Sequence, residues 1–147
     1  MTEQNFAQMR TAMVESQLRT SDVNDVRVVA AMAKVAREKF VPEGRRAMAY
    51  IDRPVRVDGG RAINPPLVTG RLITEANVKT GDKVLLIGAA SGYGAAVLEA
   101  LGAQVTAVEE DAALIALAKD AGLVLTEGSL AAGAPANAPY EIGRAHV

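Results

Sequence analysis

The sequence predicts an α/β protein with a doubly wound parallel sheet, preceded by N-terminal helices. Residues 83–128 alternate short apolar runs with helical segments, in the order strand, helix, strand, helix, strand. A glycine-containing turn directly follows the first of these runs. The chain has 147 residues, no Cys and one His. That length fits a single domain, and the composition excludes a disulfide scaffold, a thiol nucleophile and a Cys/His zinc site.

The N-terminal segment predicts two helices. The first is expected over residues 3–18, because four apolar residues recur there at roughly helical spacing: Phe6, Met9, Met13 and Leu18. The second begins after a cap at Asn24, and Pro42 limits its extent. Its expected apolar face consists of Val26, Val29, Met32 and Ala33.

Residues 50–66 interrupt this helical pattern. They contain Pro54, Gly59, Gly60, Pro65 and Pro66, which predict extended chain and turns. A connection of this length without regular structure is more often functional than a simple linker. Helical spacing returns over residues 67–76, and the preceding proline suits a helix start.

The predicted sheet occupies the segment that follows. Residues 83–87 are apolar and β-branched, as expected of a strand buried on both faces. A helix over 95–101, a strand over 105–108, a helix over 111–121 and a third apolar run at 123–125 complete the pattern. Ligands of such sheets bind at the carboxyl ends of the strands, where Gly88 and Glu109 are expected.

Gly88 and Glu109 together indicate a nucleoside-containing cofactor. Glycines let a ligand approach the backbone, and a carboxylate 21 residues later can accept hydrogen bonds from ribose hydroxyls. The alternatives are a structural strand-to-helix turn and a solvated strand end. The dinucleotide fingerprint requires Gly at 88, 90 and 93, but the chain has Ala90 and Tyr93. The missing glycines disfavour a nicotinamide-dependent oxidoreductase, which remains an alternative function.

The turn also resembles a known family. Residues 88–93, G-A-A-S-G-Y, resemble the G-x-G-S-G-Y loop of the protein-L-isoaspartate O-methyltransferases, which use S-adenosylmethionine. Residues 37–42, 49–54 and 60–66 resemble that family's R-E-x-F-V-P, A-Y-x-D-x-P and G-Q-T-I-S-Q-P segments, in the same order and at matching spacing. The resemblance implies the Rossmann-like fold of S-adenosylmethionine-dependent methyltransferases. It also implies methylation of the carboxylate of L-isoaspartyl residues in damaged proteins. The expected partners are therefore proteins or peptides that contain isoaspartyl residues.

The resemblance implies roles for individual residues. The cofactor's methionyl part would lie against Gly88, Ala89, Ala90, Ser91, Gly92 and Tyr93. Glu109 would hold the ribose, and Glu127 and Gly128 would lie near the adenine. Asn64 stands where the family has a Ser at the reacting centre, so it is the candidate catalytic residue. An amide can donate and accept hydrogen bonds there, although it is not a hydroxyl.

Several residues depart from the family pattern. Arg61, Ala62 and Pro65 replace Gln, Thr and Gln in the segment around Asn64, Leu86 replaces an acidic residue, and Ala90 replaces the middle glycine of the loop. A methyl group at residue 90 would narrow the cofactor's approach, or reshape the turn if that position requires positive φ. The alternative function is therefore a divergent, non-catalytic relative that acts as a cofactor- or protein-binding module.

The organisation of the chain follows from the same patterns. Residues 1–78 are expected to form an N-terminal helical and substrate-side segment of the same domain, and 79–140 the first half of the cofactor-binding core. Residues 141–147 abandon the apolar pattern, which predicts a non-native tail with the C-terminal strands missing. The N-terminus does not resemble a signal peptide, and no apolar run could span a membrane, so a cytoplasmic location is expected. Basic residues are interspersed with acidic ones, which does not favour nucleic-acid binding.

Overall fold

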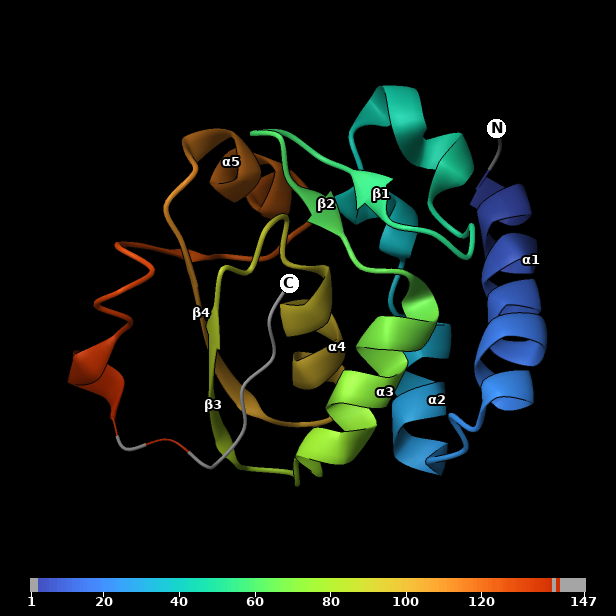
Figure 1. Ribbon diagram of the computed structural model, residues 1–147, viewed down its shortest axis with the longest axis horizontal. Helices are drawn as coiled ribbons and strands as arrows, with labels where there is room; N and C mark the ends of the chain where they lie inside the picture. The colour runs from blue at the N-terminus through green and yellow to red at the C-terminus, as the bar shows by residue number, and fades with distance from the viewer. Residues whose placement is uncertain (1–2, 139, 141–147) are drawn as a thin grey trace.

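The computed structural model describes residues 3–138 and residue 140. Three helices, α1, α2 and α3, gather at one side of the molecule, and the parallel sheet with its connecting helices lies beside them (Figure 1). The fold therefore has the α/β class that the sequence predicts. The tail predicted over residues 141–147 lies outside the described residues.

The first helical segment runs further than an α-helix alone. Helix α1 spans Glu3–Met13, and a π-helical turn, η1, continues it over Val14–Leu18, followed by a 3-10 turn, η2, over Arg19–Ser21. Met13 and Leu18 are both buried although they are five residues apart. A π-helical turn, with its i→i+5 hydrogen bonds, places residues at that spacing on one face.

Helix α2 spans Val26–Lys34, and two details of its prediction are wrong. Its N-cap is Asp25 rather than Asn24, because the Asp25 side chain accepts hydrogen bonds from the backbone N–H groups of Arg27 and Val28. Val26 consequently occupies the first helical turn and is 80% exposed. Ala33 is exposed as well, and the buried face consists of Val28, Val29, Ala31 and Met32.

The stretch expected to be extended chain and turns contains short regular elements. Two 3-10 turns, η3 at Arg37–Phe40 and η4 at Glu43–Met48, lead into it. Strands β1 (Val55–Arg56) and β2 (Ala62–Ile63) then pair in an antiparallel hairpin. Helix α3 spans Pro66–Ala76 with its proline in the first turn, as predicted.

The sheet contains three parallel strands in the order β3-β4-β5. Strand β3 spans Lys83–Ile87, helix α4 Tyr93–Ala100, strand β4 Gln104–Glu109, helix α5 Ala112–Asp120 and strand β5 Thr126–Glu127. Because consecutive strands step in one direction across the sheet, right-handed crossovers put α4 and α5 on the same face. A doubly wound sheet has helices from two such halves, one on each face, and the described residues contain one of these halves.

Two predictions about the strands need correction. The third strand is not the apolar run at 123–125 but Thr126–Glu127. Leu123 and Leu125 are buried beside it, while Val124 between them is 87% exposed. Strand β3 is not buried on both faces, because Leu85 and Ile87 are only half-buried. Leu86, by contrast, faces α4 and is buried.

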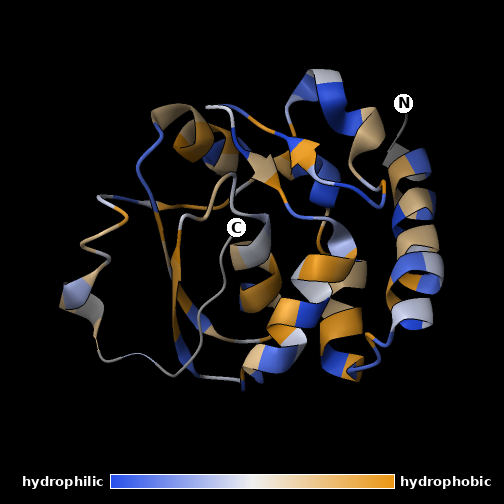
Figure 2. Ribbon diagram, viewed as in Figure 1, coloured by the Kyte–Doolittle hydropathy of each residue, from blue (hydrophilic) through white to orange (hydrophobic). Residues whose placement is uncertain are grey.

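One continuous hydrophobic core joins the N-terminal helices to the sheet. Strands β3 and β4 are largely hydrophobic along their length, whereas α1 mixes polar and apolar residues (Figure 2). Within the described part of the chain, no helix is long and apolar enough to cross a membrane. The core and the parallel strands fix the sheet end at which the predicted cofactor residues lie.

Candidate functional site

The predicted cofactor residues meet at the carboxyl end of the sheet. Residues 88–93 follow β3, Glu109 is the last residue of β4, and Glu127 ends β5 in register with Glu109. The backbone N–H of Gly128 donates to the Glu109 carbonyl at 3.2 Å. Residues 88–93 are all buried, whereas Glu127 is exposed and Gly128 is half-buried. The parallel topology therefore brings all of these residues to the same end of the sheet, where the strands have their carboxyl ends.

The loop keeps a tight turn although it has an alanine where the family has glycine. The N–H groups of Gly88 and Ala89 both donate to the Val108 carbonyl, at 2.9 and 3.1 Å, which ties the loop to β4. Ala90 has φ of 53°, a left-handed conformation that is uncommon for a residue with a Cβ. The turn thus retains positive φ at residue 90, and its methyl group is buried.

Glu109 is fully buried and its carboxylate is saturated with donors. The Arg61 guanidinium donates to both oxygens, at 2.9 Å to Oε2 and 3.0 Å to Oε1. The Ala90 N–H donates to Oε1 at 2.8 Å, and the N–H groups of Glu110 and Asp111 donate to Oε2 at 3.0 Å each. The alternative in which Glu109 is a solvated strand end is therefore excluded.

These donors control the ionisation of Glu109. Burial by itself raises the pKa of a carboxyl group, but hydrogen bonds from Arg61 and from the Asp111 and Ala90 N–H groups hold the Glu109 pKa below its usual value. The group is therefore a buried carboxylate anion at neutral pH. Such an anion is an acceptor without a proton to donate, which suits recognition of hydroxyl groups.

A buried arginine, Arg37, connects the candidate catalytic segment to the loop. Arg37 is fully buried, and its guanidinium donates to the Ala49 carbonyl at 2.5 Å and to the Asn64 carbonyl at 2.7 Å. The same guanidinium lies 4.6 Å from the centre of the Tyr93 ring. Asn64 is half-buried just before α3, and this contact holds its backbone near the loop of residues 88–93.

A polar cluster of Arg10, Glu38 and Tyr50 contacts Arg37 through the Tyr50 hydroxyl. The Tyr50 hydroxyl donates to Glu38 Oε1 at 2.5 Å and accepts from Arg10 Nε at 2.8 Å and from the Arg37 N–H at 3.1 Å. Burial raises the pKa of the Tyr50 hydroxyl above its usual value, so it stays protonated as a donor to Glu38. The cluster connects α1, η3 and the end of η4.

Three buried polar atoms around the loop lack hydrogen-bond partners among the described residues. They are Ser91 Oγ, the Tyr93 hydroxyl oxygen and one terminal nitrogen of Arg37. The Arg37 guanidinium and the Tyr93 hydroxyl interact electrostatically with each other, so Ser91 Oγ is the atom of the three that best fits a polar ligand or ordered water. An unpaired hydroxyl in this loop fits a cofactor with a polar amino-acid part.

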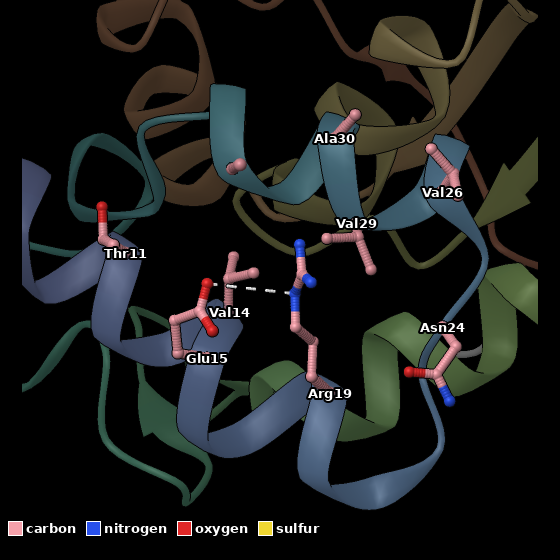
Figure 3. Close-up of a pocket in the computed structure, with 9 residues that line it drawn as sticks. Thr11, Val14, Glu15, Arg19, Asn24, Val26, Val29 and Ala30 are labelled. Atoms are coloured by element: carbon pink, nitrogen blue, oxygen red, sulfur yellow. Dashed lines mark ion pairs between the residues drawn. The ribbon is translucent and has the colours of Figure 1, made fainter.

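A separate surface groove lies away from the predicted site residues. It has a volume of about 370 Å³ and runs between the α1–η1 segment and α2 (Figure 3). Glu15 and Arg19 line it and form an ion pair at 4.0 Å, and Val26 in its lining is 80% exposed. Its lining contains no residue from the loop, from β4 or from the segment around Asn64.

Comparison with known proteins decides the family. The model of the protein-L-isoaspartate(D-aspartate) O-methyltransferase family matches residues 8–143. The chain belongs to this family. The match confirms the resemblance predicted from the loop and from the segments upstream of it.

Similar proteins carry the same description. The chain is 41% identical over 141 residues to a protein-L-isoaspartate O-methyltransferase of Methylorubrum extorquens, covering 92% of this chain and 62% of that protein. It is 37% identical over 144 residues to protein-L-isoaspartate O-methyltransferase 1 of Rhodopseudomonas palustris, covering 93% and 59%. The chain therefore spans about 60% of the length of these curated relatives.

Solved structures support the fold. A protein-L-isoaspartate O-methyltransferase superposes with a TM-score of 0.75 at 23% identity, covering 89% of this chain and 45% of the other. An isoaspartate methyltransferase from Plasmodium falciparum, solved in complex with S-adenosyl-L-homocysteine, superposes with a TM-score of 0.61 at 24% identity, covering 76% and 54%. The methyltransferase-type fold expected from the sequence is confirmed.

Sequence reasoning missed two contributions to this site. Arg37 belongs to the segment 37–42 that resembles the family, but sequence alone does not predict its burial against Tyr93 and Asn64. Arg61 was recognised as a departure from the family, but its pairing with Glu109 was not. The signal for Arg61 was available, because a basic residue replacing a neutral one in a site segment calls for an acidic partner.

Proposed function

We propose that the protein is an S-adenosylmethionine-dependent methyltransferase that esterifies the carboxylate of L-isoaspartyl residues in proteins and peptides. One observation carries the proposal. The segment that contains Asn64 lies against the loop at the end of the sheet, because Arg37 donates to the Asn64 carbonyl and lies on the Tyr93 ring. A methyl acceptor bound at this segment would therefore meet a cofactor bound at the loop.

The residues divide between cofactor and acceptor. Glu109 would accept hydrogen bonds from the ribose hydroxyls, Glu127 and Gly128 would border the adenine, and residues 88–93 would contact the methionyl part. The cofactor supplies an activated methyl group on a sulfonium. Asn64 would orient the acceptor carboxylate through its side-chain amide, and the buried Arg37 would hold the Asn64 backbone in place.

The chemistry requires no general base from this chain. An acceptor carboxylate is ionised at neutral pH and would already be a nucleophile toward the methyl group that the cofactor would supply, so no side chain has to remove a proton from it. The products are a methyl ester and S-adenosylhomocysteine, and the ester is a better leaving group than the free acid for closure to a succinimide. The role of the protein is alignment and exclusion of water.

The experiment compares two peptides that differ only at one residue, L-isoaspartate or normal aspartate. Purified protein is incubated with S-adenosylmethionine labelled on the methyl group, and the label that base releases is counted. We expect selective, base-labile labelling of the isoaspartyl peptide. Equal labelling of both peptides, or labelling that resists base, would contradict the proposed substrate.

The replacement of hydroxyls by Ala62 and Asn64 favours a second candidate, a non-catalytic cofactor- or protein-binding relative. An Asn64→Ser variant separates the two functions. Faster transfer in the variant shows that the chain supports catalysis and that the amide limits it. Cofactor binding without transfer in both proteins favours the non-catalytic relative. Two further expectations remain predictions from the sequence: that the protein lies in the cytoplasm, and that it does not bind nucleic acid.

A further inference from the structure

Arg61 covers the carboxylate that the proposed cofactor needs. Its guanidinium donates to both Glu109 oxygens and lies 3.3 Å from the Gly88 carbonyl, to which it also donates. Arg61 comes from the hairpin of β1 and β2, 48 residues before Glu109. Figure 1 shows this hairpin beside the end of the sheet. The contact is therefore tertiary and joins two separate elements.

The other donors to Glu109 cannot be exchanged for a ligand as easily. The N–H groups of Ala90, Glu110 and Asp111 belong to the backbone next to the strand ends. Two carboxylate oxygens offer about four acceptor positions, and five hydrogen bonds, three from these N–H groups and two from Arg61, already share them. Ribose hydroxyls can reach Glu109 only if a donor leaves. Among these donors Arg61 alone donates through a side chain, which can rotate away, and this side chain is 28% exposed to solvent.

We propose that Arg61 occupies the ribose position on Glu109 and that an adenosyl cofactor binds only after this guanidinium moves away. The inference rests on the proposed function, since it assumes that Glu109 is the ribose acceptor. It adds that Arg61 determines cofactor affinity. A site whose open form is a small fraction of the population binds more weakly by that same fraction.

The proposal predicts that removing the Arg61 charge tightens cofactor binding. In an Arg61→Gln variant the side chain can no longer hold Glu109 through a bidentate ion pair. We expect the dissociation constant for S-adenosylhomocysteine to fall at least tenfold. An Arg61→Lys variant retains the charge without the planar fork, so its affinity is expected between those of the wild type and Arg61→Gln.

Isothermal titration calorimetry with S-adenosylhomocysteine tests this directly. Arg56→Gln is the matched control, because Arg56 lies on the neighbouring strand of the same hairpin, is exposed, and loses the same charge. Its affinity is expected to equal that of the wild type. Circular dichroism establishes that each variant is folded before titration.

The outcomes separate this proposal from the proposed function. Tighter binding in Arg61→Gln with an unchanged Arg56→Gln control supports the role of Arg61. Binding that Arg61→Gln leaves unchanged or weakens overturns that role, and the proposed cofactor is unaffected. No binding to any folded variant overturns the proposed function together with the role of Arg61.

A spectroscopic readout follows the guanidinium itself. In the free protein, NMR of labelled arginine side chains should show slow rotation of the Arg61 guanidinium, because both of its terminal nitrogens donate to Glu109. Saturating S-adenosylhomocysteine should release this rotation and leave the buried Arg37 guanidinium restrained. If Arg61 stays restrained in the bound protein, the proposed displacement is wrong.

Discussion

At the residue scale, Glu109 shows how a buried carboxylate is kept charged. It is fully buried, and donors from Arg61, Ala90, Glu110 and Asp111 reach it. A buried charge without such partners would be strongly unfavourable. The same donors that stabilise the anion lower the pKa of Glu109, so the protonation state of one side chain is coupled to the stability of the fold.

This coupling predicts a pH dependence. The Glu109 pKa lies below its usual value of 4.5, so ionised Glu109 stabilises the folded state above about pH 4.5 and this stabilisation is lost as pH falls through the lowered pKa. At pH 7, Glu109→Gln should reduce the free energy of unfolding by about 3 kcal/mol, because it breaks a buried ion pair. Below pH 4.5 the difference between wild type and variant should shrink.

Urea denaturation at a series of pH values from about 3 to 7 measures this difference. Glu110→Gln is the control, since Glu110 is the exposed neighbour on the same loop. At pH 7 it should change the free energy of unfolding by less than about 0.5 kcal/mol. A difference between wild type and Glu109→Gln that grows as pH falls would contradict the role of the carboxylate anion.

The position of Glu109 could be predicted from sequence, but its partner could not. A carboxylate at the end of an apolar run is placed by strand topology alone, which is a local pattern. The pairing of Arg61 with Glu109 depends on how the β1–β2 hairpin packs against the sheet, a contact between residues far apart in the chain. The left-handed Ala90 was anticipated only as a condition, because residue type alone does not fix φ.

At the element scale, a buried hydrogen-bond network joins α1 to the turns that follow α2. The Tyr50 hydroxyl receives hydrogen bonds from Arg10 and the Arg37 N–H and donates to Glu38. Arg10 lies in α1, whereas Arg37 and Glu38 are neighbours in η3. The network therefore fixes the turns that carry Arg37, and through Arg37 the segment that contains Asn64.

Removing the Tyr50 hydroxyl tests this network. Tyr50→Phe leaves the ring in place and strips a partner from Glu38 and from the buried Arg37 N–H. We expect the free energy of unfolding to fall by about 2–3 kcal/mol, because buried polar groups lose their partner. Tyr140→Phe is the control, since its hydroxyl makes one bond, to the Ala134 carbonyl, and should cost about 1 kcal/mol. Equal losses in both variants, measured by chemical denaturation, would show that the network adds nothing.

Element predictions succeeded where a long periodic pattern existed and failed at boundaries. Helix α3 and strands β3 and β4 follow their apolar patterns closely. The cap of α2 lies one residue later than predicted: Asp and Asn are both good caps, and it is the Asp25 side chain that accepts from the first helical N–H groups. The predicted third strand is misplaced because Leu123 and Leu125 are buried in a segment without regular structure, directly before β5.

At the scale of the whole molecule, residues 1–78 and 79–140 share one core, and we propose that they unfold as a single unit. Buried residues of both segments form one hydrophobic cluster. The Arg27 side chain also donates to the Leu101 carbonyl at 3.4 Å, and Arg37 stacks on Tyr93. If residues 1–78 unfolded independently, they would not hold Asn64 and Arg61 against the sheet.

A cavity in the N-terminal segment tests this unity. Leu18 is fully buried in η1 and is one of the side chains nearest to Gly70 of α3. Leu18→Ala should reduce the free energy of unfolding by about 2–5 kcal/mol. If the chain is one cooperative unit, hydrogen exchange should show the same loss of protection at Met32 in α2 and at Val108 in β4. Val124→Ala, at an 87% exposed position, should leave both amides unchanged. Lost protection confined to Met32, with Val108 as in the wild type, would mean that the N-terminal segment unfolds separately from the sheet.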